Sequence, residues 1–212
     1  MIVFTGLTSY LPHALAGIPS YRTRVMYVPQ RPSLLPGSPT DFVKAIMNLH
    51  SHKILMKDDI DETTEQVMKR CSETAQCWGI SPDLWNRDWI NLSGGEGQRI
   101  LLSIAASLNT TEILLLDGVF YLYFPFCANL HEWGWIEPTS ALDSETSLMV
   151  EKFLVDLVRT RKSSLKAIVW ITHSAEQSRR VGNRFIYLFA GGCHEGGDND
   201  AVSSPYPATP IR

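Results

Sequence analysis

The segment Leu92–Arg99, which reads Leu-Ser-Gly-Gly-Glu-Gly-Gln-Arg, is the strongest chemical signal in the sequence. Gly94 and Gly95 let backbone N–H groups approach a ligand closely, and the helix that starts here points the positive end of its dipole at the same place. Ser93 adds a hydroxyl donor. These features favour a phosphate-binding turn. They also fit a glycine-rich turn before a helix capped by Ser93 and Glu96, which needs no ligand.

Polar residues also follow several short apolar runs, where they could handle a nucleotide or water. Taken singly, each acid among them also fits a solvated carboxylate in a loop. The residues are Gln30 after Arg24–Val28, Asp117 after Ile113–Leu116, and His173, which comes with Thr172 after Ala167–Ile171. Glu137 and Asp143 stand at the two ends of Glu-Pro-Thr-Ser-Ala-Leu-Asp.

Taken together, these segments resemble the motifs of ABC-type ATP-binding domains, in the order that this family has. The probability that five such motifs occur in that order by chance between Arg24 and Phe189 is negligible. Leu92–Arg99 resembles the signature motif, Gln30 the Q-loop, Ile113–Asp117 the Walker B strand, Glu137–Asp143 the catalytic glutamate with the D-loop, and Thr172-His173 the switch histidine.

The resemblance implies a role for each residue in phosphoryl transfer to water, which is mostly positioning and charge stabilisation. Asp117 would hold Mg²⁺ through water, and Glu137 would polarise the attacking water as general base. His173 would contact the γ-phosphate. Gln30 would touch Mg²⁺ or water while sensing a membrane partner.

The resemblance also implies partners, because the family works as a head-to-tail dimer with two shared ATP sites. Ser93, Gly94, Gly95 and Gln98 would reach the ATP of the opposite protomer, and Asp143 would lie in the D-loop. The implied cofactors are ATP and Mg²⁺. The implied partners are a second nucleotide-binding domain, in a homo- or heterodimer, and a transmembrane transporter subunit.

The family's P-loop, GxxxxGK[ST], has no counterpart in the sequence. It is expected several tens of residues before Gln30, and no Gly-Lys pair occurs at any position. Without it, no lysine or nest of amides cradles the β- and γ-phosphates. We therefore expect an N-terminally truncated domain without its first strand and P-loop, and poor ATP binding by the chain alone.

A segment of 19 residues, Gly118–Ile136, separates Asp117 from Glu137, which are adjacent in the family. Seven of its residues are aromatic, against 10% in the whole chain. Without the segment the motif reads Ile-Leu-Leu-Leu-Asp-Glu-Pro-Thr-Ser. Our hypothesis is an unspliced intron of a eukaryotic gene, translated in frame. A regulatory loop and a membrane-touching hairpin are the alternatives.

The inserted segment is expected to impair hydrolysis. Closing a loop of this length is cheap, because each doubling of loop length costs only about 0.6 kcal/mol, so Glu137 could return near Asp117. The exact position of Glu137 matters more, because a displacement of about 1 Å can lower the rate roughly 100-fold. We expect little or no hydrolysis by this chain alone.

The elements that must position these residues are helices alternating with buried strands. Helices are expected over Asp41–His50, Asp61–Trp78, Asn91–Leu108 and Asp143–Arg161, and a further strand over Phe185–Phe189. This alternation favours a mostly parallel sheet covered by helices. With the resemblance, it predicts an α/β P-loop NTPase (RecA-like) core with an ABC-type helical subdomain, its first strand and P-loop missing.

The predicted domain boundaries follow the motifs. Residues 1–39 form a remnant of the N-terminal part of the core with the Q-loop, and 40–108 the helical subdomain that ends in the signature helix. Residues 109–190 form the C-terminal part of the core, with 118–136 as a foreign insert. Residues 191–212, rich in Gly, Ser, Asp and Pro, are expected to be a disordered tail.

Composition and charge are those of an ordinary globular protein, with 44% hydrophobic and 19% charged residues. A formal net charge of −3 provides no basic footprint, so no nucleic-acid partner is expected. The four cysteines lack metal-ligand spacing and fit reduced thiols of the cytosol. The longest strongly apolar run, Val119–Leu130, is too short for a membrane span. We expect a cytoplasmic protein, peripheral on the cytoplasmic face of a membrane.

The expected function is that of the ATP-binding and ATP-hydrolysing subunit of an ABC transporter, which couples hydrolysis to transmembrane transport. The chain itself is expected to be impaired, because it lacks the P-loop. Two alternatives stay open, a catalytically inactive partner that completes the site of a whole cassette and an inert fragment. A full enzyme binds MgATP by itself. The inactive partner binds it only together with a second subunit, and the inert fragment does not bind it either alone or with a second subunit.

Overall fold

The structure is a computed structural model of the whole chain. It describes residues 2–6, 17–29, 35–53, 62–117, 144–161, 163–172, 174–189 and 192–196.

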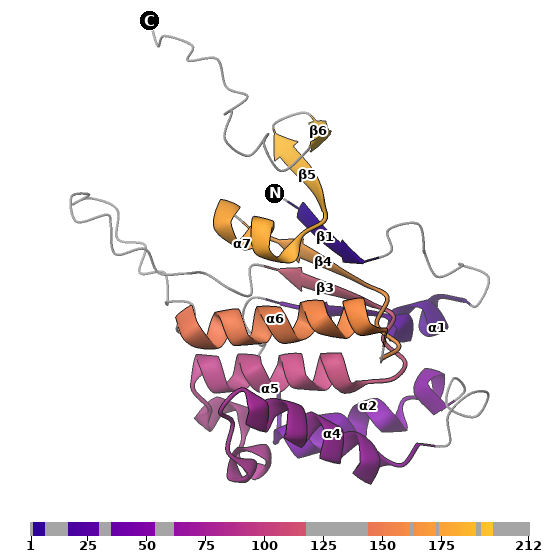
Figure 1. Cartoon of the computed structure of the whole chain (residues 1–212). Coiled ribbons are helices and arrows are strands. Elements are labelled where there is room, and N and C mark those ends of the chain that lie inside the picture. The colour runs from indigo at the N-terminus through magenta and orange to yellow at the C-terminus, as the bar shows by residue number, and fades with distance from the viewer. Residues whose placement is uncertain are drawn as a thin grey trace, which may run out of the picture.

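Six described strands form one sheet, in the order β2-β3-β4-β1-β5-β6. β2 pairs with β3, and β3 with β4, in parallel. β1 is antiparallel to both β4 and β5, so β5 runs in the same direction as β2, β3 and β4, while β6 runs against it (Figure 1). The strands are β1 (Ile2–Gly6), β2 (Val25–Val28), β3 (Ile113–Asp117), β4 (Ala167–Ile171), β5 (Arg184–Phe189) and β6 (Gly192–Gly196).

The helices confirm the α/β prediction. α5 and α6 lie beside each other next to the sheet, and α2 and α4 lie on the far side of α5 (Figure 1). Two short 3-10 helices, η2 (Pro82–Asn86) and η3 (Trp89–Asn91), precede α5. The α-helices are α1 (Gly17–Arg24), α2 (Pro39–Asn48), α4 (Thr64–Cys77), α5 (Gly94–Ser107), α6 (Ser144–Thr160) and α7 (Ala175–Val181).

The first hydrophobic core lies between the sheet and helices α5 and α6. Leu114, Leu116, Ile168 and Trp170 alternate with less buried residues along β3 and β4, as expected for one packed face of a sheet. The α6 residues in this core are Val150, Leu154, Val155 and Val158.

The second core joins α2, α4, the 3-10 helices and the outer side of α5. Val43, Val67, Cys71 and Ala75 are its fully buried members from α2 and α4. Burial raises the pKa of the Cys71 thiol to about 12, so this cysteine stays protonated and inert. A helical unit was predicted over 40–108, and its exact boundaries stay a prediction.

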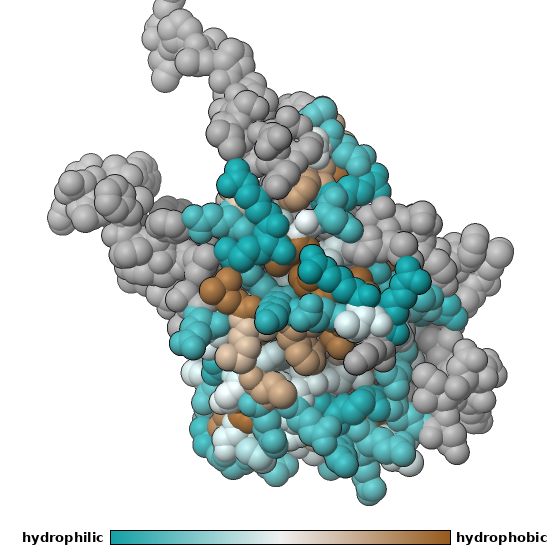
Figure 2. Space-filling view, viewed as in Figure 1, coloured by the Kyte–Doolittle hydropathy of each residue, from teal (hydrophilic) through white to brown (hydrophobic). Residues whose placement is uncertain are grey.

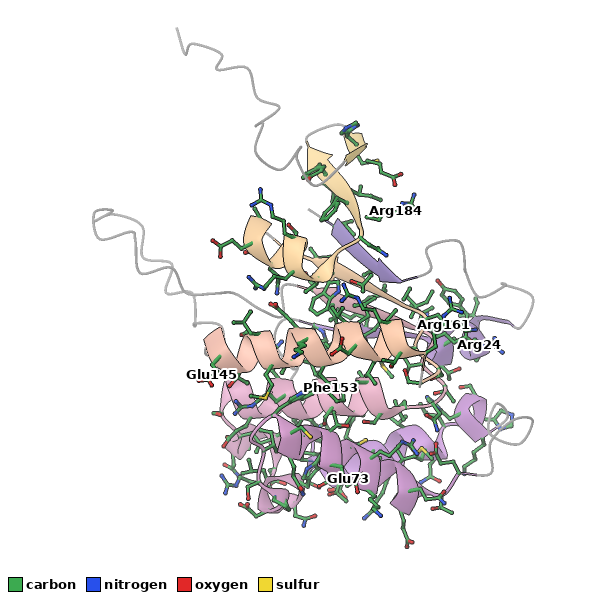
Figure 3. The ribbon with its side chains drawn as sticks, viewed as in Figure 1. Arg24, Glu73, Glu145, Phe153, Arg161 and Arg184 are labelled. Carbon is green, nitrogen blue, oxygen red and sulfur yellow. The ribbon has the colours of Figure 1, made fainter. Side chains whose placement is uncertain are left out.

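Trp78, at the end of α4, connects the second core with the first. It belongs to the first core, although α4 belongs to the second. Its ring meets that of Phe153 edge to face, with ring centroids 5.3 Å apart. Phe153 lies where α6 faces α5 (Figure 3). The two cores therefore share contacts through α5 and Trp78. Brown atoms gather in the band where α6 and α5 run, between hydrophilic surfaces (Figure 2).

A strand that the sequence did not predict occupies the slot between β4 and β5. It comes from Ile2–Gly6, in a segment without a family motif. Gly6 pairs with Ala167, the first residue of β4, so β1 ends where β4 begins. The carboxyl end of β1 therefore lies at the edge of the sheet opposite Asp117.

The prediction of a disordered tail from residue 191 needs a correction. Gly192–Gly196 forms β6, which pairs antiparallel with β5, and Arg184 forms an ion pair with Glu195 across the two strands. The physical reason is the open edge of β5, whose unpaired N–H and C=O groups favour a further strand. Residues 197–212 lie outside the described residues.

Helix α7 is tied to α6 by a buried carboxylate. The Glu151 side chain is 4% exposed. Its Oε1 accepts from Nε2 of Gln177 at 2.9 Å, and its Oε2 accepts from Nε of Arg180 at 2.9 Å.

We predict that Glu151→Gln lowers the free energy of unfolding by about 1–3 kcal/mol, because the charge-assisted bonds to Arg180 and Gln177 are lost while the shape is kept. Chemical denaturation measures the change. Asp156→Asn, an acid-to-amide change on the exposed side of α6, is the matched control and should change stability little. Equal effects of the two substitutions would contradict the proposed contribution of this contact.

Candidate functional site

The carboxyl ends of β2, β3 and β4 lie at one edge of the sheet. Val28 pairs with Leu116, and Asp117 pairs with Ile171, so the three strands end within one residue of each other. Asp117 is therefore the last residue of the central strand of the three. In open α/β sheets, this edge is where ligands bind.

The other residues predicted at this edge lie outside the described residues. Gln30 comes two residues after Val28 in the chain, and His173 two residues after Ile171. Glu137 and Asp143 belong to the segment between Asp117 and α6. For these four, the roles that the resemblance implies stay predictions.

Asp117 has one described hydrogen-bond partner, Tyr27 on β2. The Tyr27 hydroxyl donates to Oδ2 of Asp117 at 2.9 Å. This bond raises the pKa of Tyr27 above its usual value, since it favours the protonated phenol, and some burial and the charge of Asp117 act in the same direction. Sequence reasoning missed this contact, because it depends on the strand register, which places Tyr27 beside Leu115, two residues before Asp117.

The described residues contain no cluster of three side chains that could hold a metal ion. Asp117 is the described residue that fits Mg²⁺ at this edge, because it offers carboxylate oxygens, the ligand type that Mg²⁺ prefers. Mg²⁺ usually keeps several waters and takes one or two carboxylates plus phosphate oxygens. A single aspartate that acts through water is compatible with that chemistry.

The signature segment forms the head of α5, as predicted. Ser93 is the N-cap, and its hydroxyl accepts from the backbone N–H of Glu96 at 3.3 Å. The backbone N–H of Ser93 donates to Glu96 Oε2 at 2.8 Å, which completes the capping box. This bond, together with the hydroxyl of Ser93, lowers the pKa of Glu96.

Ser93 and Gly94 are exposed, so the turn is open to a ligand. The first N–H groups of a helix have no acceptor within it. The capping box uses that of Glu96, and no described residue accepts from those of Gly94 or Gly95. The turn can therefore offer two backbone donors to an anion while its helix stays capped.

Gly95 and Gln98 lie deeper in the first turns of α5. Gly95 is buried, and Gln98 is 3% exposed. The Nε2 atom of Gln98 makes no hydrogen bond to any described residue. A buried donor without an acceptor costs free energy, so this amide is an unsatisfied polar group among the described residues.

The chain path brings the signature turn and Asp117 to the same side of the domain. Residues 108–112 join α5 to β3, so the helix runs back along the strand. Figure 1 shows the start of α5 and the arrowhead of β3 on the same side. Arg24 and Arg161 lie at the opposite end of the sheet (Figure 3).

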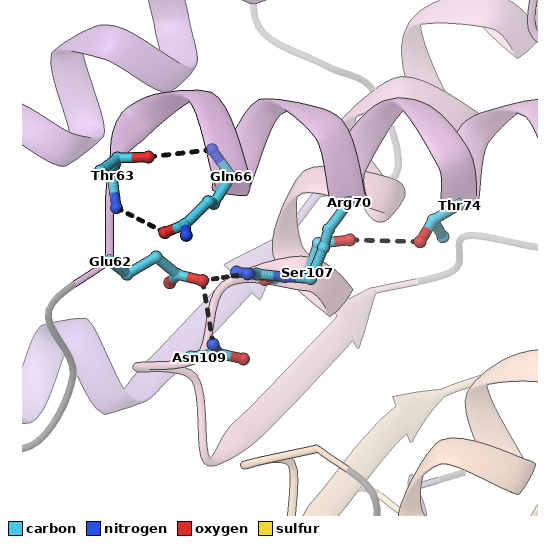
Figure 4. Close-up of polar contacts among 7 residues, drawn as sticks. All are labelled: Glu62, Thr63, Gln66, Arg70, Thr74, Ser107 and Asn109. Atoms are coloured by element: carbon cyan, nitrogen blue, oxygen red, sulfur yellow. Dashed lines mark hydrogen bonds and ion pairs between the residues drawn. The ribbon is translucent and has the colours of Figure 1, made fainter.

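The far end of α5 is held by α4. Nη2 of Arg70 donates to the Ser107 carbonyl at 2.9 Å, and the same guanidinium forms an ion pair with Glu62 (Figure 4). Glu62 also accepts from Nδ2 of Asn109 at 3.2 Å. An arginine at the last carbonyls of a helix is favoured by the helix dipole. The helix that carries the signature turn is therefore fixed at both ends.

An apolar pocket of about 170 Å³ lies beside β2, between this strand and helices α2 and α5. Tyr27, Pro29, Leu35 and Phe42 are among its lining residues. It contains no charged side chain, so it is not a phosphate site. Tyr27 belongs both to this pocket and to the contact with Asp117.

The sequence is related to ATP-binding subunits of known transporters, although no family model matches it. It is 29% identical over 185 residues to the phosphate import ATP-binding protein PstB of Idiomarina loihiensis, covering 87% of this chain and 57% of that protein. The protein of the same name from Mycoplasma capricolum is 30% identical over 174 residues, covering 82% and 53%. The chain thus spans less than two thirds of the length of these relatives.

Solved structures show the same fold. An ATP-binding subunit of an ABC transporter matches with a TM-score of 0.62 at 15% identity, covering 92% of this chain and 67% of that one. A dimeric ATP-binding cassette in a post-hydrolysis state, bound to ADP and Pi, matches with a TM-score of 0.54 at 24% identity, covering 83% and 65%.

We predict that Asp117→Asn lowers the pKa of Tyr27 toward the usual value of about 10, because the carboxylate that stabilises the protonated phenol is gone. The pH dependence of the tyrosine ring resonances measures it. Asp156→Asn, an acid-to-amide change on the exposed side of α6, is the matched control and should leave the titration of Tyr27 unchanged. An unchanged titration of Tyr27 in Asp117→Asn would show that the contact is not formed in solution.

Proposed function

We propose that this chain, which belongs to the family of ABC-type ATP-binding domains, acts as an ATP-binding subunit of an ABC transporter. Its named relatives are ATP-binding proteins of phosphate import. The observation that carries the proposal is the open, capped turn at Ser93–Gly95, on the same side of the domain as Asp117. The proposed partners are a second ATP-binding domain and a transmembrane subunit.

The turn at the head of α5 is proposed to bind the terminal phosphate of an ATP molecule held by the partner domain. Gly94 and Gly95 offer free backbone N–H groups, and the dipole of α5 favours an anion there. Gln98 is buried one turn further along α5, and its side chain would have to become exposed to reach this phosphate. Because Ser93 and Gly94 are exposed, a phosphate carried by another molecule can reach them.

The edge at Asp117 is proposed to serve an ATP site of its own. Asp117 would hold Mg²⁺ through water, and the ion, when bound, neutralises charge on the phosphates. Glu137 would take a proton from the attacking water, and His173 would contact the γ-phosphate. Gln30 would contact the ion or the water, and Asp143 would lie in the loop facing the partner.

These 212 residues include no P-loop, and β1 leads away from the Asp117 edge. The proposal therefore assigns to this chain the signature turn and the Asp117 edge, but not the phosphate cradle. This observation favours one second candidate function, that of an inactive partner which completes the ATP site of a whole cassette.

For the described residues, no helix has the length and apolar character of a membrane span.

The proposal is tested with a complete ATP-binding cassette from the same organism. We predict that MgATP makes the chain associate with this cassette, and that the pair binds more MgATP than the cassette alone. Isothermal titration and size-exclusion chromatography measure both. The chain by itself is expected to bind MgATP poorly. Identical MgATP binding with and without the chain would contradict the proposal.

Two variants make this test specific. Ser93→Gly removes the hydroxyl and lowers the stability of the helix by only a few tenths of a kcal/mol. If the additional MgATP binding of the pair then weakens about tenfold or more, the loss reports the phosphate contact rather than unfolding. Deleting residues 118–136 joins Asp117 to Glu137 and is expected to raise hydrolysis by the pair. The unmodified pair is the reference for both variants.

A further inference from the structure

We infer that Tyr27 is a positioning residue for Asp117, holding one carboxylate oxygen so that the other stays available to the metal-bound water. The inference rests on the proposed function, in which Asp117 serves a magnesium–nucleotide site. It adds a residue that none of the sequence motifs includes, three positions before Gln30.

The geometry follows from the parallel pairing of β2 and β3. Tyr27 pairs with Leu115, and alternate residues of a strand share a face, so Asp117 lies on the same face as Leu115 and Tyr27. A tyrosine side chain is long enough to span this diagonal. Its hydroxyl meets Oδ2 of Asp117 at 2.9 Å, a normal hydrogen-bond length.

The surroundings make this bond the main local constraint on the carboxylate. Within the described residues Asp117 has no ion pair, and Tyr27 is its one hydrogen-bond donor. Tyr27 is 53% exposed, and Ile171, next to Asp117 on β4, is 37% exposed. Without the phenol, the carboxylate at this open edge would be free to rotate into water.

The chemistry of the donor suits a cation site. A phenol is a neutral donor, so it orients the aspartate and leaves its negative charge intact. A lysine or arginine at the same place would neutralise the charge and repel a magnesium ion. Since the described residues engage only Oδ2, they leave Oδ1 open to an acceptor role toward a metal-bound water.

The test must separate the hydroxyl of Tyr27 from the rest of the residue. Tyr27 lines the apolar pocket between β2, α2 and α5. Tyr27→Phe keeps the ring and removes only the hydroxyl. Tyr21→Phe, on α1 and away from the described site, is the matched control.

The experiment titrates Mn²⁺, used in place of Mg²⁺, into the full chain with ATP and the complete cassette. Paramagnetic broadening of the Leu116 methyl resonances reports the metal beside Asp117. We expect Tyr27→Phe to raise the Mn²⁺ midpoint about threefold to tenfold, because a partly exposed bond to a charged group is lost. Tyr21→Phe should leave the midpoint unchanged, and the thermal unfolding midpoints of both variants should agree.

The outcomes are distinguishable. Equal Mn²⁺ midpoints for Tyr27→Phe and the unmodified chain would overturn the positioning role while leaving the proposed function intact. If Mn²⁺ broadens no Leu116 signal even in the unmodified chain, the magnesium–nucleotide site at Asp117 is wrong, and the inference fails with it.

Discussion

The parallel register of β2, β3 and β4 is the constraint on which the proposed chemistry depends. It makes three strand ends meet at one edge, with Asp117 at the end of the middle strand. The opposite edge is tied by Glu112, whose carboxylate binds Arg24 at 3.1 Å and Lys166 at 3.0 Å, one residue before β2 and one before β4. A slip of one residue would turn Asp117 to the other face of the sheet and separate it from Tyr27.

The second half of the proposed site depends on the rigidity of α5. One side of this helix packs into the sheet core through Leu102 and Ala105, and another into the helical core through Ile100 and Ile104. Its head is closed by the capping box and its tail by Arg70. The open turn at Ser93 is therefore presented by a helix that both cores hold in place.

Patterns local in sequence predicted the fold well. The buried strands before Asp117 and His173 and the capping box of Ser93 with Glu96 were expected and are present. Two features were missed because they depend on pairing between distant segments. β1 forms by pairing with both β4 and β5, which are distant from it in the sequence. The contact of Tyr27 with Asp117 depends on the register of β2 and β3. Neither leaves a motif in the sequence.

Locating the terminal phosphate of ATP on this chain tests the proposed role of the signature turn most directly. A photoreactive ATP with its crosslinker on the γ-phosphate would be bound to the complete cassette in the presence of the chain, and the labelled peptides mapped by mass spectrometry. We predict labelling of residues 93–98 that excess ATP abolishes. Labelling confined to the cassette, or found on this chain only away from that turn, would contradict this role.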